Sequence, residues 1–96
     1  MTSRVSVQLE DFDVSIELAK LRAGDKRVGA VCSFVGTVRD INEGDAVSEL
    51  ELEHYAGMTE KSLEAMIDKA HQRFDIYAAR IIHRIGKLSP LDQIVF

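Results

Sequence analysis

The residues best suited to chemistry stand at the end of an apolar stretch that runs from Gly29 to Arg39. Its β-branched residues favour a strand, and its low polar content predicts that this strand is covered on both faces and central in a sheet. Gly36 inside it predicts a β-bulge or a close approach of another backbone or a ligand. At the exit, Arg39 offers a permanent charge and a rigid fork of donors that suits phosphate or carboxylate. The stretch therefore indicates an anion-binding strand end, and a solvated arginine on a core strand is the plainer alternative.

Alternating glutamates form a second group with possible chemistry. Glu49, Glu51 and Glu53 share one face of a strand predicted over 46–55. Carboxylates in a row suit metal binding or acid–base catalysis, but a solvated strand face is the favoured interpretation. His54 continues the apolar row of the other face, which favours a hydrogen-bonded core histidine over a ligand or a base.

Two arginines, Arg80 and Arg84, share one face of a strand predicted over 78–86. They could bind an anion or an acidic partner surface. Opposite charges on facing strands stabilise a sheet modestly, so pairing with the glutamates of residues 49–53 is favoured.

The elements that must position these residues begin with a strand over residues 5–9, which alternate apolar and polar side chains. Asp13 is predicted to cap a helix over 14–23, and Gly24 to end it in a left-handed conformation. The turn-forming residues of 40–45 predict a loop between two strands, which a ligand at Arg39 could order.

Thr59 is predicted to cap a longer helix over 60–74. A turn centred on Pro90 and a strand from Gln93 follow. The order of elements gives an α+β domain, for which a ferredoxin-like sandwich is the nearest common fold. The apolar stripe of the longer helix is expected to be core, and it consists of Leu63, Met66, Ile67, Ala70 and Phe74.

The composition limits the classes of function. Ninety-six residues make one domain, and a net charge of −4 with a pI near 5.3 argues against a nucleic-acid surface. We expect neither a bilayer-spanning segment nor a signal peptide, and the sequence has no zinc-ligand spacing and no Gly-rich phosphate loop. The single cysteine cannot form an internal disulfide, so a reducing cytoplasm is expected. We expect neither a metal nor a cofactor.

The last four residues, 93–96, are the start of an apolar strand with no polar tail behind it. Chain termini normally lie solvated at the surface, so the sequence predicts a polypeptide shortened at its C-terminus.

Five segments in order resemble one family. They are Gly-Ala-Val at 29–31, Phe-Val-Gly-Thr-Val-Arg at 34–39, Leu-Glu-His-Tyr at 52–55, Gly-Met-Thr-Glu-Lys at 57–61 and His-Arg-Ile-Gly at 83–86. Over residues 29–96 the chain is similar to the large, catalytic subunit of molybdopterin synthase, the MoaE family, and the first 28 residues are similar only loosely.

This resemblance implies an α/β-hammerhead fold, with a mixed or antiparallel sheet and two helices. It implies a sulfurtransferase of molybdenum cofactor biosynthesis. A small ubiquitin-like subunit would present a C-terminal thiocarboxylate, and its sulfur would pass to cyclic pyranopterin monophosphate to form the dithiolene of molybdopterin. The assembly implied is a heterotetramer around a homodimer of large subunits.

The resemblance also implies which residues bind substrate. Thr37, Val38 and Arg39 match the segment that binds the pterin and its phosphate. Sulfur arrives on the partner, so Cys32 is expected to be a small buried residue rather than a persulfide carrier. The catalytic lysines of the family match positions beyond Phe96, so no catalytic residue is expected within the chain.

Two departures bear on this interpretation. Lys61, Lys69 and Lys87 do not match the family lysines, and Leu91 stands where members usually have glycine. A non-catalytic scaffold that docks the small subunit is therefore a second interpretation, and a ferredoxin-like ligand-binding module is a third.

Overall fold

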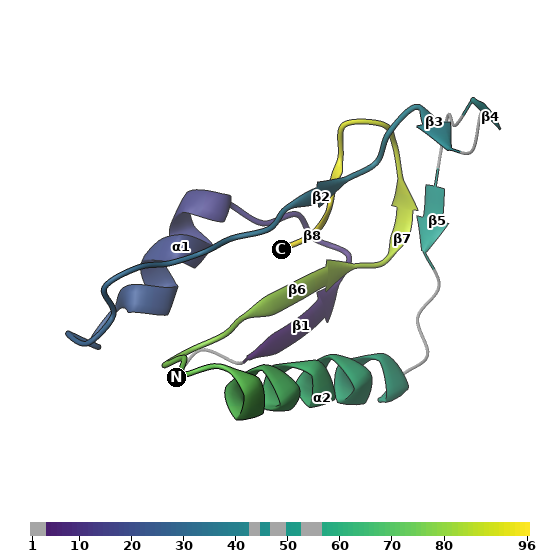
Figure 1. Ribbon diagram of the computed structural model, residues 1–96. Coiled ribbons are helices and arrows are strands. Elements are labelled where there is room, and N and C mark those ends of the chain that lie inside the picture. Colours follow the sequence, from purple (N-terminus) through teal and green to yellow (C-terminus); the bar gives the residue numbers. More distant parts are fainter. Residues whose placement is uncertain (1–3, 43–44, 47–49, 53–56) are drawn as a thin grey trace.

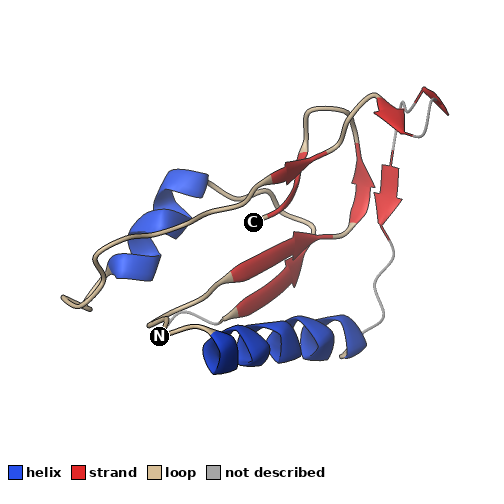
Figure 2. Ribbon diagram, viewed as in Figure 1, coloured by secondary structure: helices blue, strands red, loops and turns tan. Residues whose placement is uncertain are grey.

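The computed structural model describes residues 4–42, 45–46, 50–52 and 57–96, with side chains described for 4–40 and 57–96. Two helices and several short strands form an α+β domain, which confirms the predicted fold class (Figure 1, Figure 2). No helix in the described part has the length and apolar character to cross a bilayer. The elements are β1 (Val5–Gln8), α1 (Val14–Arg22), β2 (Gly36–Thr37), β3 (Ile41–Asn42), β4 (Asp45–Ala46), β5 (Leu50–Leu52), α2 (Met58–Arg73), β6 (Ile81–Arg84), β7 (Gly86–Leu88) and β8 (Gln93–Val95).

The main sheet is mixed and has the strand order β1–β6–β8–β2. β1 and β6 run parallel, whereas β8 is antiparallel to both β6 and β2. Beyond β8, Phe96 and Ile82 exchange backbone hydrogen bonds of 2.9 and 3.1 Å. β6 therefore lies inside the sheet, and its Ile82 is only 1% exposed.

Between β6 and β8 the chain leaves the main sheet. β7 pairs with β5, with Leu50 opposite Leu88 and Leu52 opposite Gly86, and β3 pairs with β4 as a short hairpin. A plain ferredoxin-like sandwich has no such excursion, so the arrangement favours the fold that the resemblance implies. Part of the loop predicted over 40–45 is this hairpin.

α2 lies along β1, beneath the sheet in Figure 1. Ile67 is 2% exposed at this contact. Arg4 extends from the start of β1 and donates to Glu64 at 2.8 Å and to Asp68 at 2.9 Å. These contacts fix the helix against the parallel pair of strands.

Two predictions for α2 are wrong. The residue before the helix is Gly57, with φ of 82°, and Thr59 lies inside the first turn rather than capping it. Met66 and Phe74 are 59% and 64% exposed, because only the side of the stripe around Ile67 faces the sheet.

α1 follows the sequence prediction closely. The Asp13 carboxylate accepts from the Ile16 amide at 3.1 Å, and Gly24 has a φ of 77° just beyond the helix. Glu17 is buried and pairs with Lys20 at 3.3 Å and Arg80 at 3.4 Å, which joins the helix to the segment before β6.

The prediction of a central strand over residues 29–38 is wrong. Only Gly36 and Thr37 are paired, and they form the edge strand β2. Residues 29–35 are irregular and exposed, with Phe34 at 74%. The composition fits a strand, but β8 is only three residues long, and no described strand lies beside 29–35 to complete a ladder.

The turn from Ser89 to Asp92 confirms the predicted turn at Pro90. The Asp92 amide donates to the Ser89 carbonyl at 3.0 Å, and Leu91, the third turn residue, has a φ of 79°. A type II turn requires a positive φ at this position and therefore favours glycine. Leu91 is the one non-glycine residue with positive φ in the described part of the chain, and its side chain is 89% exposed.

We expect Leu91→Gly to stabilise the fold. The left-handed conformation costs a side chain about 1–2 kcal/mol, and the greater flexibility of unfolded glycine returns about half of that. The free energy of unfolding from urea titrations should rise by about 0.5–1 kcal/mol. Leu9→Gly is the matched control, because Leu9 is also exposed, at 61%, but has no positive φ. Equal losses of stability in both variants would contradict the assignment of strain to Leu91.

Candidate functional site

The predicted irregularity at Gly36 is confirmed at the edge of the sheet. Gly36 lies opposite Val95, whereas Thr37 lies opposite Gln93, so the register shifts between them. A Cβ atom on Gly36 would lie 2.8 Å from Cγ1 of Val95, closer than carbon atoms can pack. Glycine is required here because the two strands approach so closely.

Val38 anchors the chain directly after this bulge. Its side chain is 4% exposed, and its backbone makes two hydrogen bonds of 2.9 Å, from its amide to the Asp92 carbonyl and from the Leu91 amide to its carbonyl. Thr37 and Arg39, on either side of it, are exposed. In the predicted site, the side chains of Thr37 and Arg39 therefore lie at the surface, on either side of the buried Val38.

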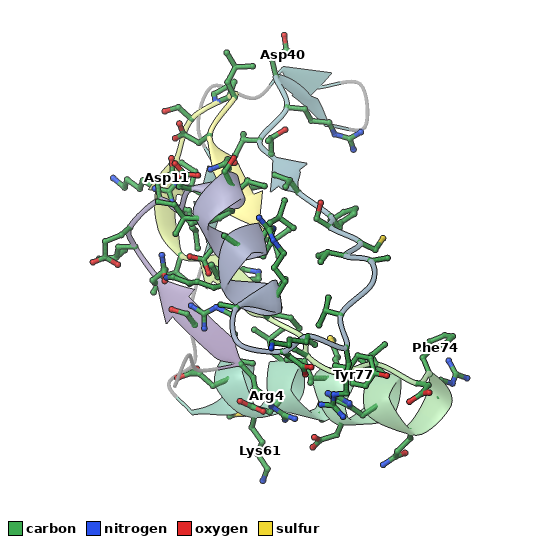
Figure 3. All side chains as sticks on the ribbon, turned by 90° about the vertical axis from the view of Figure 1, so that its left-hand side faces the viewer. Arg4, Asp11, Asp40, Lys61, Phe74 and Tyr77 are labelled. Atoms are coloured by element: carbon green, nitrogen blue, oxygen red, sulfur yellow. The ribbon has the colours of Figure 1, made fainter. Side chains whose placement is uncertain are left out.

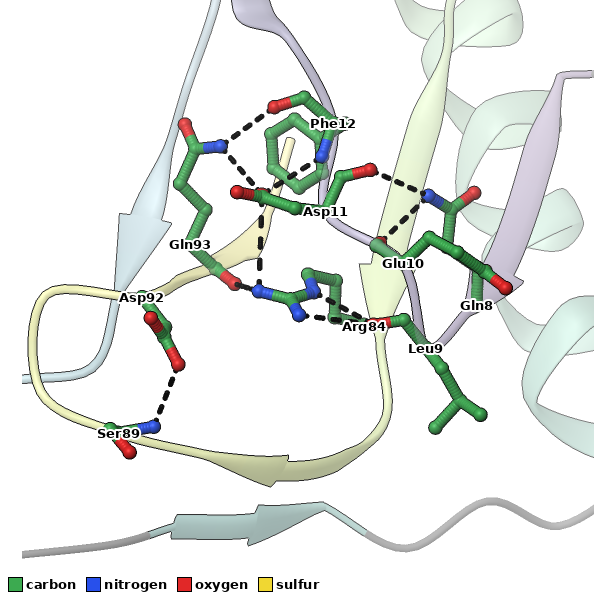
Figure 4. A network of polar contacts seen from close by, with 9 residues as sticks. All are labelled: Gln8, Leu9, Glu10, Asp11, Phe12, Arg84, Ser89, Asp92 and Gln93. Carbon is green, nitrogen blue, oxygen red and sulfur yellow. Dashed lines mark hydrogen bonds and ion pairs between the residues drawn. The ribbon is translucent and has the colours of Figure 1, made fainter.

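The turn that holds Val38 is itself fixed at both ends. The Asp92 carboxylate accepts from the Ser89 amide at 2.8 Å, as Figure 4 shows. The guanidinium of Arg84 donates to the Gln93 carbonyl at 3.0 Å and to the Leu9 carbonyl at 3.0 and 3.2 Å. Arg84 therefore joins the end of β1 to the start of β8.

Asp11 and the Gln93 side chain complete this network (Figure 4). The Gln93 amide donates to the Asp11 carboxylate and to the Phe12 carbonyl, both at 2.8 Å, and Arg84 lies 3.8 Å from the same carboxylate. The pKa of Asp11 lies below its ordinary value, because Gln93 donates to its charged form, as does the Phe12 amide. Asp11 and Gln93 stand 82 positions apart in the chain, so no local pattern in the sequence pointed to this network.

The sequence predicted that Arg80 and Arg84 pair with the glutamates of residues 49–53 on a facing strand, but the strand β5 does not lie beside β6. Arg80 pairs with Glu17, and Arg84 binds the carbonyls described above. The physical reason is strand order, since β5 lies beside β7 whereas β6 lies between β1 and β8. Glu49, Glu53 and His54 lie outside the described residues, as does the side chain of Glu51, so the pairing with these glutamates stays a prediction.

Cys32 is exposed, which overturns the prediction that it is buried. The irregular segment that carries it lines an open, mostly apolar groove of about 830 Å³, together with Leu63 and Met66 of α2 and with Phe96. The cysteine lacks burial because its segment is not paired within a sheet.

The two lysines of α2 lie away from Arg39. Lys61 and Lys69 are on α2, which packs on β1, whereas β2 is at the opposite edge of the sheet. Figure 3 shows Asp40, the neighbour of Arg39, at the other end of the molecule from Lys61. Among the residues described, no cluster of histidine, cysteine and carboxylate side chains could hold a metal ion. The strand end therefore presents an exposed, permanently charged side chain, with no lysine of α2 beside it.

The fold and this strand end define an α+β domain with an excursion between β6 and β8 and an exposed arginine at the exit of an edge strand. The model of the MoaE protein family matches residues 7–96. The chain belongs to this family.

Curated relatives support this assignment. The chain is 60% identical over 91 residues to the molybdopterin synthase catalytic subunit of Ralstonia nicotianae, covering 95% of this chain and 52% of the relative. It is 54% identical over 95 residues to the subunit of the same name from Vibrio cholerae, covering 99% of this chain and 63% of the relative. The chain thus spans between one half and two thirds of the length of these relatives.

Solved structures are similar over the same span. Molybdopterin cofactor biosynthesis protein E from Burkholderia multivorans has a TM-score of 0.85 and 52% identity, with 99% of this chain and 61% of that chain covered. Molybdopterin synthase from Staphylococcus aureus also has a TM-score of 0.85, at 27% identity, with 99% of this chain and 68% of that chain covered.

We expect Gly36→Ala to destabilise the fold by about 1–3 kcal/mol, because the added methyl group must displace the stiff Val95 side chain. Urea denaturation measures this change. Gly29→Ala is the control, since nothing lies within 4 Å of a Cβ atom there. A similar small effect in both variants would show that β2 and β8 do not approach as closely as described.

We expect Asp11→Asn to change the dependence of stability on pH. A carboxyl whose pKa is lowered on folding stabilises the native state above its unfolded pKa of about 4, and this contribution is lost as the pH falls through the folded pKa. Wild type should therefore exceed the variant in free energy of unfolding at pH 7, and the difference should vanish at acidic pH. Glu10→Gln is the control for loss of a neighbouring charge, and a difference independent of pH would contradict this role of Asp11.

Proposed function

We propose that this chain acts as the catalytic subunit of molybdopterin synthase in molybdenum cofactor biosynthesis. In this proposal it binds cyclic pyranopterin monophosphate and receives the thiocarboxylated C-terminus of a small ubiquitin-like subunit. Sulfur passes from that thiocarboxylate to the pterin and forms the dithiolene of molybdopterin. The proposed place of this sulfurtransferase reaction is the cytoplasm, and the proposed assembly is a heterotetramer around two large subunits.

The observation that carries the proposal is the exposed Arg39 directly after an immobilised Val38, in a chain of this family. The guanidinium would hold the phosphate, because it is permanently charged and can donate two parallel hydrogen bonds. The Thr37 hydroxyl would be a further donor from the same exposed strand end, and Val38 would contribute its fixed backbone. Pre-organisation of this backbone lowers the entropic cost of holding the ligand.

A second candidate function is a scaffold that docks the small subunit without turnover. It is favoured by the positions of Lys61 and Lys69 on α2, away from Arg39, because sulfur transfer by this family is expected to use lysines at the pterin. The two functions differ in one measurement. Mixing the chain with the thiocarboxylated subunit and cyclic pyranopterin monophosphate gives molybdopterin in the first case and only a protein complex in the second.

We expect Arg39→Ala to weaken binding of cyclic pyranopterin monophosphate by about 10- to 100-fold, the loss typical of a hydrogen-bonded charge pair. Isothermal titration calorimetry on the 96-residue chain measures the dissociation constant.

Arg73→Ala is the matched control. Arg73 is an exposed arginine at the end of α2, so the variant makes the same change in net charge far from β2. Equal weakening by both variants would mean that the ligand senses only overall charge, and the assignment of Arg39 to the phosphate would then fail.

A further inference from the structure

Arg84 is a nearly buried cation that hydrogen-bonds to backbone carbonyls rather than to a carboxylate. Its side chain is 13% exposed, and its guanidinium donates to the Leu9 carbonyl at 3.0 and 3.2 Å and to the Gln93 carbonyl at 3.0 Å. The Asp11 carboxylate lies 3.8 Å away, beyond hydrogen-bond distance. Burial of a permanent charge is costly unless hydrogen bonds satisfy it, so Arg84 is held by the two carbonyls that it joins.

These two carbonyls belong to different parts of the fold. The Leu9 carbonyl follows β1, against which α2 packs. The Gln93 carbonyl is the first of β8, directly after the turn of residues 89–92. β8 is in register with β6 at Val95, two positions later, so Arg84 adds a tie between these strands at the start of β8.

The turn carries this support to the strand end at Arg39. The Asp92 carbonyl accepts from the Val38 amide at 2.9 Å, and the Leu91 amide donates to the Val38 carbonyl at 2.9 Å. The Val38 carbonyl belongs to the peptide group that leads into Arg39. Each link of this path is a backbone hydrogen bond or a peptide group except Arg84, which contributes a side chain.

We propose that Arg84 is a positioning residue for anion binding at Arg39, and that it acts through the Gln93 carbonyl. This inference rests on the proposed function, which assigns Arg39 to the phosphate of the pterin. Arg84 itself does not bind the phosphate in this proposal, because its nearly buried guanidinium already donates to two carbonyls, whereas Arg39 is exposed. A strand end that is held before the ligand arrives loses less conformational freedom on binding, which raises the affinity.

Arg84→Lys tests the inference, because lysine keeps the charge but lacks the planar fork that joins the two carbonyls. We expect its dissociation constant for cyclic pyranopterin monophosphate, measured by calorimetry on the 96-residue chain, to rise about three- to tenfold, the range for one group that must be ordered on binding. Arg80→Lys is the matched control. The Arg80 side chain is 12% exposed but pairs with Glu17 of α1, so this variant should bind the pterin within about twofold of wild type.

Two further measurements separate positioning from a general loss of stability. In the free Arg84→Lys variant, amide hydrogen exchange should speed up at Val38 and Leu91 more than at Phe96, whose amide is bonded within the sheet. In a double-mutant cycle, Arg84→Lys should weaken pterin binding by less than about twofold once Arg39 is replaced by alanine, because the phosphate contact that it positions is then absent.

If Arg84→Lys does not fold, Asp92→Ala breaks the same path by removing the acceptor of the Ser89 amide, and the same rise in the dissociation constant is expected. The inference alone would be overturned by unchanged pterin affinity in the folded variant, by an equal effect of Arg80→Lys, by uniformly faster exchange, or by undiminished weakening in the Arg39→Ala background. Pterin binding that is insensitive to Arg39→Ala would overturn the proposed site and the inference together.

Discussion

The candidate site depends on the pair of hydrogen bonds that join Val38 to the turn at Leu91 and Asp92. β2 is only two residues long and lies at the edge of the sheet, so it cannot fix the direction of the chain by itself. The turn at Leu91 and Asp92 fixes this direction. The turn itself is held by hydrogen bonds of the Asp92 carboxylate and of Arg84. Arg39 thus leaves the sheet from a fixed peptide group.

The turn that supports this strand end is also joined to the end of β1, which is distant in the sequence. Arg84 binds the Leu9 carbonyl and the Gln93 carbonyl at once, so the end of β1 and the start of β8 are held together. An arginine can do this because its fork of donors is planar and rigid, whereas a lysine would offer a single charged centre. Phe12 adds an apolar contact to this join, with its ring centroid 5.9 Å from that of Phe96.

The sequence predicted the features that rest on local chemistry. Four such predictions are confirmed, and each rests on the backbone preference of a single residue type. They are the helix cap at Asp13, the helix end at Gly24, the bulge at Gly36 and the turn at Pro90. The α+β class also followed from the order of elements.

Features that rest on neighbours could not be predicted in this way. Residues 29–35 have the composition of a strand, but a strand forms only where another strand pairs with it. β8 is three residues long and pairs only with Gly36 and Thr37, so residues 29–35 remain outside the sheet. The partners of Arg80 and Arg84 depend on strand order, which a single sequence does not reveal. Arg39 follows a two-residue edge strand rather than a buried central one, and the support of this strand end by Arg84 and Gln93 joins residues distant in sequence.

The central claim is that the strand end around Arg39 is a phosphate-binding site. A titration of the isotope-labelled chain with cyclic pyranopterin monophosphate, followed by amide chemical shifts in NMR spectra, tests it most directly. The account predicts that the largest shifts fall on residues 37–40 and on Leu91 and Asp92, and saturate together. Largest shifts elsewhere, such as along α2 or around Arg80, would contradict it.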